Sequence, residues 1–90
     1  MIIETAREYV RHMTAGRLAL TDRLFEEEFG DRTAFSISVS MTDSESGERD
    51  SCTARDITGD VSEALHMFKL ISDGTVTPMT LIDIISDLLP

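Results

Sequence analysis

The 90-residue chain has little of several residue types on which specialised functions depend. Its single cysteine, Cys52, excludes an internal disulfide and offers no pair of thiols to a metal, which fits a reducing compartment. It contains no tryptophan, two histidines and one lysine, Lys69. No apolar run approaches the roughly 18 residues that a membrane span needs, and no basic segment followed by an apolar one begins the chain. We therefore expect a cytoplasmic protein.

Positive charge is also scarce. Eight basic side chains stand against 17 acidic ones, and the formal net charge is −9. Proteins that bind nucleic acid or anionic membranes present a patch of lysine and arginine, which scattered arginines do not supply. We therefore expect neither of these partners. Ninety residues, 41% of them hydrophobic, predict one folded domain over residues 1–90.

No residue spacing in the chain matches a catalytic, cofactor-binding or metal-binding motif, so we predict no residues for these roles and no cofactor. The three glutamates at positions 26–28 are adjacent, whereas a calcium loop needs ligands at alternating positions. They predict a solvated acidic connection. An enzyme or small-ligand binder is the alternative hypothesis, and its site would combine His66, Cys52, Asp56 and Asp83. A cleft joining these four side chains would favour it.

The last sixth of the chain is its densest apolar segment and predicts a helix over residues 78–89. Thr77 is expected to be the N-cap, with Pro78 in the first helical position, where no amide hydrogen is needed. Four apolar residues recur at helical spacing: Leu81, Ile84, Ile85 and Leu88. Ile82 and Leu89 widen this stripe beyond what one small sheet can cover. These two side chains are the predicted interaction surface, for a protein partner or for self-association as a homodimer.

A second helix is predicted just before it, over residues 60–73. Asp60 as N-cap and Glu63 three residues later form the capping-box pattern, and Gly74 is expected to end the helix in a left-handed conformation. The predicted inner stripe is Val61, Ala64, Leu65, Phe68 and Ile71.

Residues 33–41 carry the clearest strand pattern in the chain. Apolar side chains occupy alternate positions, at Phe35, Ile37, Val39 and Met41, while Ala34 and three serines (36, 38 and 40) fill the solvent face. The polar stretch 43–48 predicts a turn. Residues 49–56 then predict an edge strand with Cys52 and Ala54 facing inward.

The pattern of residues 2–29 permits two interpretations. Ile3, Ala6, Val10 and Met13 fit a helical spacing. The same region also reads as two strands joined by a hairpin turn at residues 14–16. Periodicity leaves both open.

The layout of residues 33–89 resembles the family catalogued as domain of unknown function 6514, short proteins of anaerobic Gram-positive bacteria. Its specific part is a Val-Thr-Pro-x-Thr-Leu-x-Asp pattern, matched at Val76, Thr77, Pro78, Thr80, Leu81 and Asp83. The resemblance implies a strand hairpin in residues 2–29 and carries no activity. Where the family has Tyr-Gly-Ile, this chain has Ala34-Phe35-Ser36-Ile37, so a role for that tyrosine would not transfer.

Together these observations predict an α+β fold. We expect an antiparallel sheet of about four strands, followed by two C-terminal helices packed on one face. The expected function is a small protein-interaction or regulatory module without catalysis.

Overall fold

The computed structural model describes residues 2–5 and 8–89. These residues form a sheet followed by two helices, which confirms the α+β class. The elements are β1 (Ile2–Thr5), β2 (Glu8–Ala15), β3 (Leu18–Phe29), β4 (Arg32–Asp43), β5 (Arg49–Thr58), α1 (Val61–Asp73) and α2 (Leu81–Leu88). The sheet is antiparallel with its strands in chain order, and the short β1 adds a strand to the four predicted.

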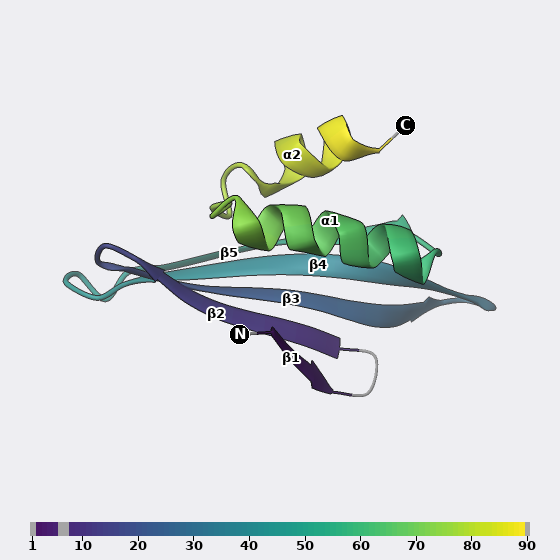
Figure 1. Cartoon of the computed structure of the whole chain (residues 1–90), viewed down its shortest axis with the longest axis horizontal. Helices are drawn as coiled ribbons and strands as arrows, with labels where there is room; N and C mark the ends of the chain where they lie inside the picture. The colour runs from purple at the N-terminus through teal and green to yellow at the C-terminus, as the bar shows by residue number, and fades with distance from the viewer. Residues whose placement is uncertain (1, 6–7, 90) are drawn as a thin grey trace.

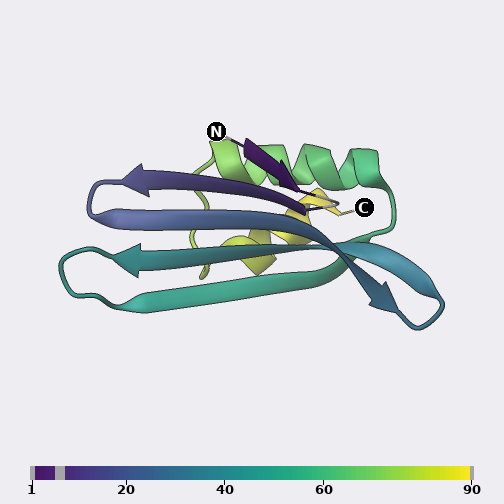
Figure 2. The same cartoon turned by 90° about the horizontal axis from the view of Figure 1, so that it is seen from below.

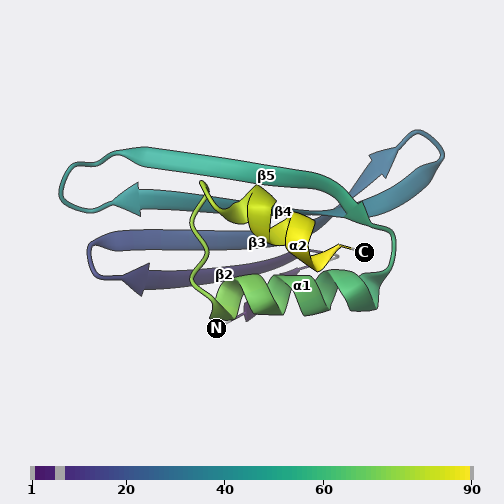
Figure 3. The same ribbon diagram turned by 90° about the horizontal axis from the view of Figure 1, so that it is seen from above.

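The two helices lie on one face of the sheet (Figure 1). They run in opposite directions beside each other above the strands (Figure 3). The opposite face has no helix in front of it (Figure 2). The far end of the β3–β4 hairpin extends past both helices. The described part of the chain is therefore a two-layer domain with one covered and one open sheet face.

Residues 8–15 and 18–29 are strands, as the family resemblance implied. β2 and β3 pair from Glu8 opposite Phe25 to Ala15 opposite Leu18. The prediction of an acidic connection at residues 26–28 is wrong. These glutamates continue β3 and pair with β4 at positions 33–35, so their backbone groups find hydrogen-bond partners. The turn comes later, at Gly30, whose φ of +66° suits a residue without a side chain.

The core lies between the inner sheet face and the helices. Alternation in β4 predicted three of its buried members, Phe35, Ile37 and Val39. The buried apolar residues that form this core cluster are Leu20, Leu24, Phe35, Ile37, Val39, Ala54, Ile57, Ala64, Met67, Phe68, Ile71, Val76, Leu81 and Ile85. Cys52 is half-buried at the edge of this core.

Helix α1 begins as predicted. The Asp60 carboxylate accepts the backbone amides of Ser62 and Glu63 at 2.8 and 3.3 Å. The inner stripe differs from the prediction at its first residue: Val61 is half-exposed, while Met67 is buried. The helix end also differs. Gly74 keeps a right-handed conformation, and the left-handed residue is Thr75, with a φ of +53°.

The predicted cap at Thr77 and start at Pro78 are wrong for helix α2. The amide of Thr80 donates to the carbonyl of Thr77 at 3.1 Å, which closes a separate turn around the buried Pro78. The first helical hydrogen bond runs from the amide of Ile84 to the carbonyl of Thr80, at 3.0 Å. The Thr77 hydroxyl lies against the Thr80 hydroxyl at 3.2 Å and accepts no backbone amide, so the helix begins at Leu81 without a side-chain cap.

Candidate functional site

The four residues of the alternative hypothesis come from three elements, and no recorded hydrogen bond or ion pair joins them. His66 is exposed on α1, Asp83 is exposed on α2, and Cys52 is half-buried on β5. Asp56, also on β5, is bound to Arg32. The structure records no hydrogen bond or ion pair between any two of the four. Within residues 2–5 and 8–89, no group of three or more His, Cys, Asp or Glu side chains could hold a metal ion.

Asp56 has a structural position in an irregular part of the sheet. The pairing of β4 with β5 shifts between Phe35 and Ile37, and Asp56 takes a left-handed φ of +56° there. Aspartate is one of the few residues that tolerates this conformation. Both carboxylate oxygens accept hydrogen bonds from Arg32, and this pairing lowers the pKa of Asp56. The carboxylate of Asp56 is therefore already bound to Arg32, at the point where the register of β4 and β5 shifts.

The open sheet face holds a second polar group. The hydroxyl of Ser36 donates to Glu27 at 2.7 Å and accepts the backbone amide of Asp56 at 3.2 Å. Arg55 donates to the other Glu27 oxygen. The Ser36 hydroxyl, followed by Arg55, lowers the pKa of Glu27. These bonds use the hydroxyl of Ser36 to tie β3, β4 and β5 together.

The serine face of β4 is less exposed than predicted. Ser36 is fully buried and Ser38 nearly so. Their direct cross-strand partners on β3 are Phe25 and Arg23, whose long side chains stack with the guanidinium carbon 4.7 Å from the ring centre. Short side chains between long neighbours lose contact with water even on a sheet face that no helix covers.

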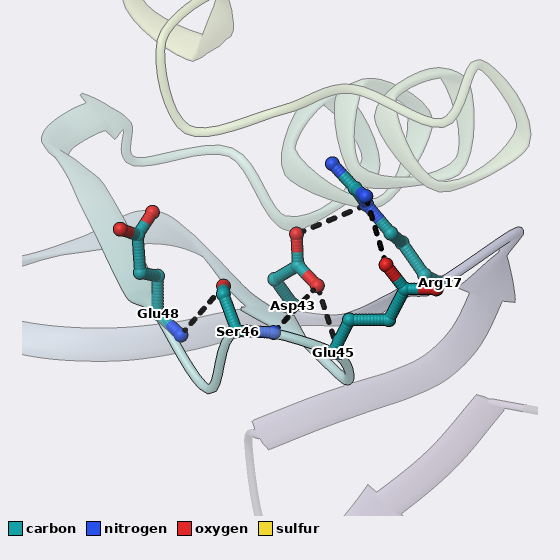
Figure 4. A network of polar contacts seen from close by, with 5 residues as sticks. All are labelled: Arg17, Asp43, Glu45, Ser46 and Glu48. Atoms are coloured by element: carbon teal, nitrogen blue, oxygen red, sulfur yellow. Dashed lines mark hydrogen bonds and ion pairs between the residues drawn. The ribbon is translucent and has the colours of Figure 1, made fainter.

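A third polar network lies at the end of the sheet where the β2–β3 and β4–β5 turns meet (Figure 4). Arg17 from the first turn forms ion pairs with Asp43 and Glu45 at 3.1 and 3.0 Å. The Asp43 carboxylate accepts the amides of Glu45 and Ser46, and the amide of Glu48 donates to the Ser46 hydroxyl. The Glu45 amide is the main cause of the lowered pKa of Asp43. This network holds the two turns together.

The most unusual polar group lies inside the core. Asp22 is 1% exposed, and neither of its carboxylate oxygens has a hydrogen-bond partner. The hydroxyl of Ser72 on α1 is buried and without a partner too. Sequence reasoning missed this pair. The signal was available, because Asp22 shares the parity of Leu20 and Leu24 on a strand whose apolar side faces inward.

Both helices carry exposed apolar side chains, and the most exposed one in the described residues, Met79, lies just before α2. Met79, in the turn before the helix, is 78% exposed, and Ile82 is 48% exposed. We define the α2 surface by the exposed residues Met79, Ile82, Asp83, Ser86 and Asp87. Leu89, the other residue predicted for an interaction, is half-buried and packs against the core.

Ion pairs with arginine neutralise several acidic side chains of the sheet, whereas α2 has no basic residue of its own. Each of five arginines in the sheet or its turns forms an ion pair, namely Arg11–Asp73, Arg17–Asp43, Arg23–Glu8, Arg32–Asp56 and Arg55–Glu27. No ion pair is recorded for Asp83 or Asp87, and α2 itself contains no basic residue. The α2 surface is therefore both apolar and uncompensated in its negative charge.

Comparison with known proteins places the chain in a family without assigning it an activity. No helix of the described residues is long and apolar enough to cross a membrane. Searches of curated proteins and of solved structures give no match. A family model described as "Family of unknown function (DUF6514)" matches residues 1–90, which confirms the resemblance read from the sequence. The chain belongs to the DUF6514 family.

Proposed function

We propose that this protein is a protein-interaction module that binds a basic, amphipathic segment of a partner protein through the α2 surface. The observation that carries the proposal is the exposure of Met79 and Ile82 beside the unpaired carboxylates Asp83 and Asp87. A partner segment with apolar and cationic side chains would complement both properties.

The apolar part of the argument rests on how α2 packs. Leu81 and Ile85 already bury the inner side of the helix against the core. Met79 and Ile82 lie outside that contact and keep much of their apolar surface in water. Burying such area releases about 25 cal/mol per Å², so a docked partner gains a stabilisation that folding leaves unused.

The electrostatic part favours a different chain over a second copy. A two-fold dimer places the same patch of both copies face to face. Two α2 surfaces would then bring Asp83 and Asp87 of one copy near those of the other, without a basic residue on either helix. With a net charge of −9 on each chain, a basic partner is electrostatically the better complement.

The β5 edge extends the docking region. Among the described residues β5 is the last strand of the sheet, so one side of its backbone has no neighbouring strand there, and α2 contacts β5. An unpaired edge offers amide and carbonyl groups to an added segment. Charged residues on β5, including Arg49, Asp50 and Arg55, limit unspecific pairing along it.

Binding of a model peptide tests the proposal. The probe is a short, fluorescently labelled peptide of leucine and lysine arranged as an amphipathic helix, followed by fluorescence anisotropy. We expect saturable binding that weakens as salt is raised. Ile82→Glu should weaken it about tenfold or more, because a charge would enter the apolar contact.

Two controls distinguish binding at the α2 surface from unspecific attraction of a basic peptide to an acidic protein. Val61→Glu adds the same charge to a side chain of matching exposure, 49% against 48%, at the end of α1 remote from the α2 connection. It should leave the affinity unchanged. A peptide with glutamate in place of lysine should not bind. Equal weakening by both variants, or no binding of the basic peptide, would refute the proposal.

The enzyme or ligand-binding hypothesis receives no support from the geometry. It required His66, Cys52, Asp56 and Asp83 to share a cleft, yet Asp56 is held by Arg32 and no interaction joins the four. The cytoplasmic location stays a prediction, and self-association through the α2 surface is the alternative to a basic partner.

A further inference from the structure

The core of this small domain contains a carboxyl group that the fold leaves unsatisfied. Asp22 lies on the inner face of β3 between Leu20 and Leu24, beneath helix α1. Its two oxygens and the hydroxyl of Ser72 are buried and form no hydrogen bond of normal geometry, although the Ser72 hydroxyl lies close enough to Asp22 to lower its pKa. Buried polar atoms normally find partners, and an ionised carboxylate that lacks them is much costlier than a neutral one.

One cation lies within reach of Asp22, and it is engaged elsewhere. Arg11 on β2 is the direct cross-strand partner of Asp22. Its guanidinium donates to Asp73, the last residue of α1, at 2.8 Å. This ion pair attaches the end of the helix to the sheet.

Within residues 2–5 and 8–89, the other groups around Asp22 include no second cation. β4 presents Val39 opposite it, and Tyr9 lies on the same face of β2. Further along β3, that face carries Glu26. The last turn of α1 has no basic residue, and the negative end of the helix dipole disfavours a carboxylate there.

We propose that Asp22, Arg11 and Asp73 form a proton-controlled latch on the end of helix α1. The Arg11–Asp73 ion pair holds the helix end on the sheet, and the latch assigns this arrangement to neutral Asp22. When Asp22 releases its proton to the solvent, the buried carboxylate attracts Arg11, and the bond to Asp73 breaks.

The direction of the proton equilibrium supports this latch. Burial raises the pKa of Asp22 above its ordinary value of 3.8, while the Ser72 hydroxyl and the charge of Arg11 oppose the rise. The folded state therefore binds the proton more tightly than the unfolded state. The stability contributed by neutral Asp22 is fully present below pH 3.8 and is lost as the pH rises through the raised pKa.

The latch lies next to the segment that leads to α2. Residues 74–80 connect Asp73 to α2, so release of the helix end changes the support of the α2 surface. Control of partner binding by this route rests on the proposed function. The latch itself does not depend on the proposed function, and its test needs no partner protein.

The test is a titration of the intact, isotope-labelled protein followed by NMR. The side-chain carboxyl signal of Asp22 should titrate above pH 3.8, and the backbone amides of residues 70–80 should shift with the same midpoint. In Asp22→Asn that shift should disappear. In Asp73→Asn, an exposed change that removes the same ion pair, those amides should resemble the high-pH wild type at every pH.

Either of two results would overturn the latch. One is an Asp22 midpoint at or below pH 3.8. The other is an unchanged titration of residues 70–80 in Asp22→Asn. Should Asp22→Asn fail to fold, the wild-type midpoint and the Asp73→Asn comparison still decide.

Discussion

Thr75 is a β-branched residue in a left-handed conformation, with a φ of +53°. Such a residue meets steric strain that glycine avoids. The strain lies at the end of α1, where the chain turns toward α2. The neighbouring Gly74 has a right-handed conformation, and a Cβ atom there would lie 3.1 Å from the carbonyl oxygen of Leu70. Position 75 therefore favours a residue that tolerates a positive φ, whereas position 74 favours a residue without a Cβ atom.

We predict that Thr75→Gly stabilises the domain by about 1 kcal/mol, because it removes the left-handed penalty. Chemical denaturation should show a higher midpoint with an unchanged slope. Thr75→Ala is the matched control, because it shortens the side chain but keeps the Cβ atom, and it should gain little. Equal gains in both variants would locate the effect in the side chain and not in the backbone.

Single residues also show where sequence reasoning ends. Alternation along β4 was sufficient to place Phe35 and Ile37 in the core. The same rule places Asp22 there, yet an aspartate between leucines ordinarily indicates a solvent-facing position. The conflict is resolved only by the packing of α1 over β3, which involves residues about 50 positions apart in the chain.

At the scale of elements, the two helices begin in different ways. Asp60 caps α1 through two backbone amides, whereas α2 has no side-chain cap. The sequence pattern before α2 was the more suggestive of the two, since it combines threonine with proline. The start of α2 follows from the burial of Pro78 and from the turn between Thr77 and Thr80, and not from the capping preference of threonine and proline.

We therefore predict unequal effects of removing the two caps. Asp60→Ala should destabilise the domain by about 1 kcal/mol, because two amides in the first turn of α1 lose their acceptor. Thr77→Ala should cost less than about 0.5 kcal/mol, because its hydroxyl accepts no amide. Denaturant midpoints measured side by side provide the comparison. A loss for Thr77→Ala as large as that for Asp60→Ala would contradict the observed start of α2.

Strands were predictable in proportion to how strictly they alternate. β4 and β5 followed from their patterns and from the polar turn between them. β2 and β3 did not, because apolar residues at both helical and strand spacing permitted two interpretations. The family resemblance decided in favour of strands. The acidic residues 26–28 were assigned to a loop because charge ordinarily indicates contact with solvent. In a strand that extends beyond the helices, however, the backbone can pair with its neighbour while the side chains stay in water.

At the scale of the whole molecule, the two-layer arrangement gives a covered sheet face, an open sheet face and an outer surface on α2. One sheet face is closed by helices, and the open face is occupied by ion pairs that neutralise one another. The α2 surface combines two apolar side chains that lie outside the core, Met79 and Ile82, with two carboxylates for which no ion pair is recorded. The candidate interface was predictable in part: Ile82 was identified from the helical pattern, but Met79 was not, since its exposure depends on the turn that delays the helix.

We predict that the isolated protein is a monomer at micromolar concentration. Repulsion between matching acidic surfaces opposes a two-fold dimer, and a basic segment is absent from the helices. Size exclusion coupled to light scattering should give a mass near 10.0 kDa. A doubled mass that Ile82→Glu restores to the monomer value would instead identify a second copy as the occupant of the α2 surface.

Mapping amide shifts by NMR during titration with the unlabelled leucine–lysine peptide tests the central claim most directly. We predict that the largest shift changes fall on residues 79–87 and on the adjacent part of β5, and that Ile82→Glu but not Val61→Glu removes them. Shift changes concentrated on the open sheet face, or changes that persist in Ile82→Glu, would contradict the claim that this protein binds its partner through α2.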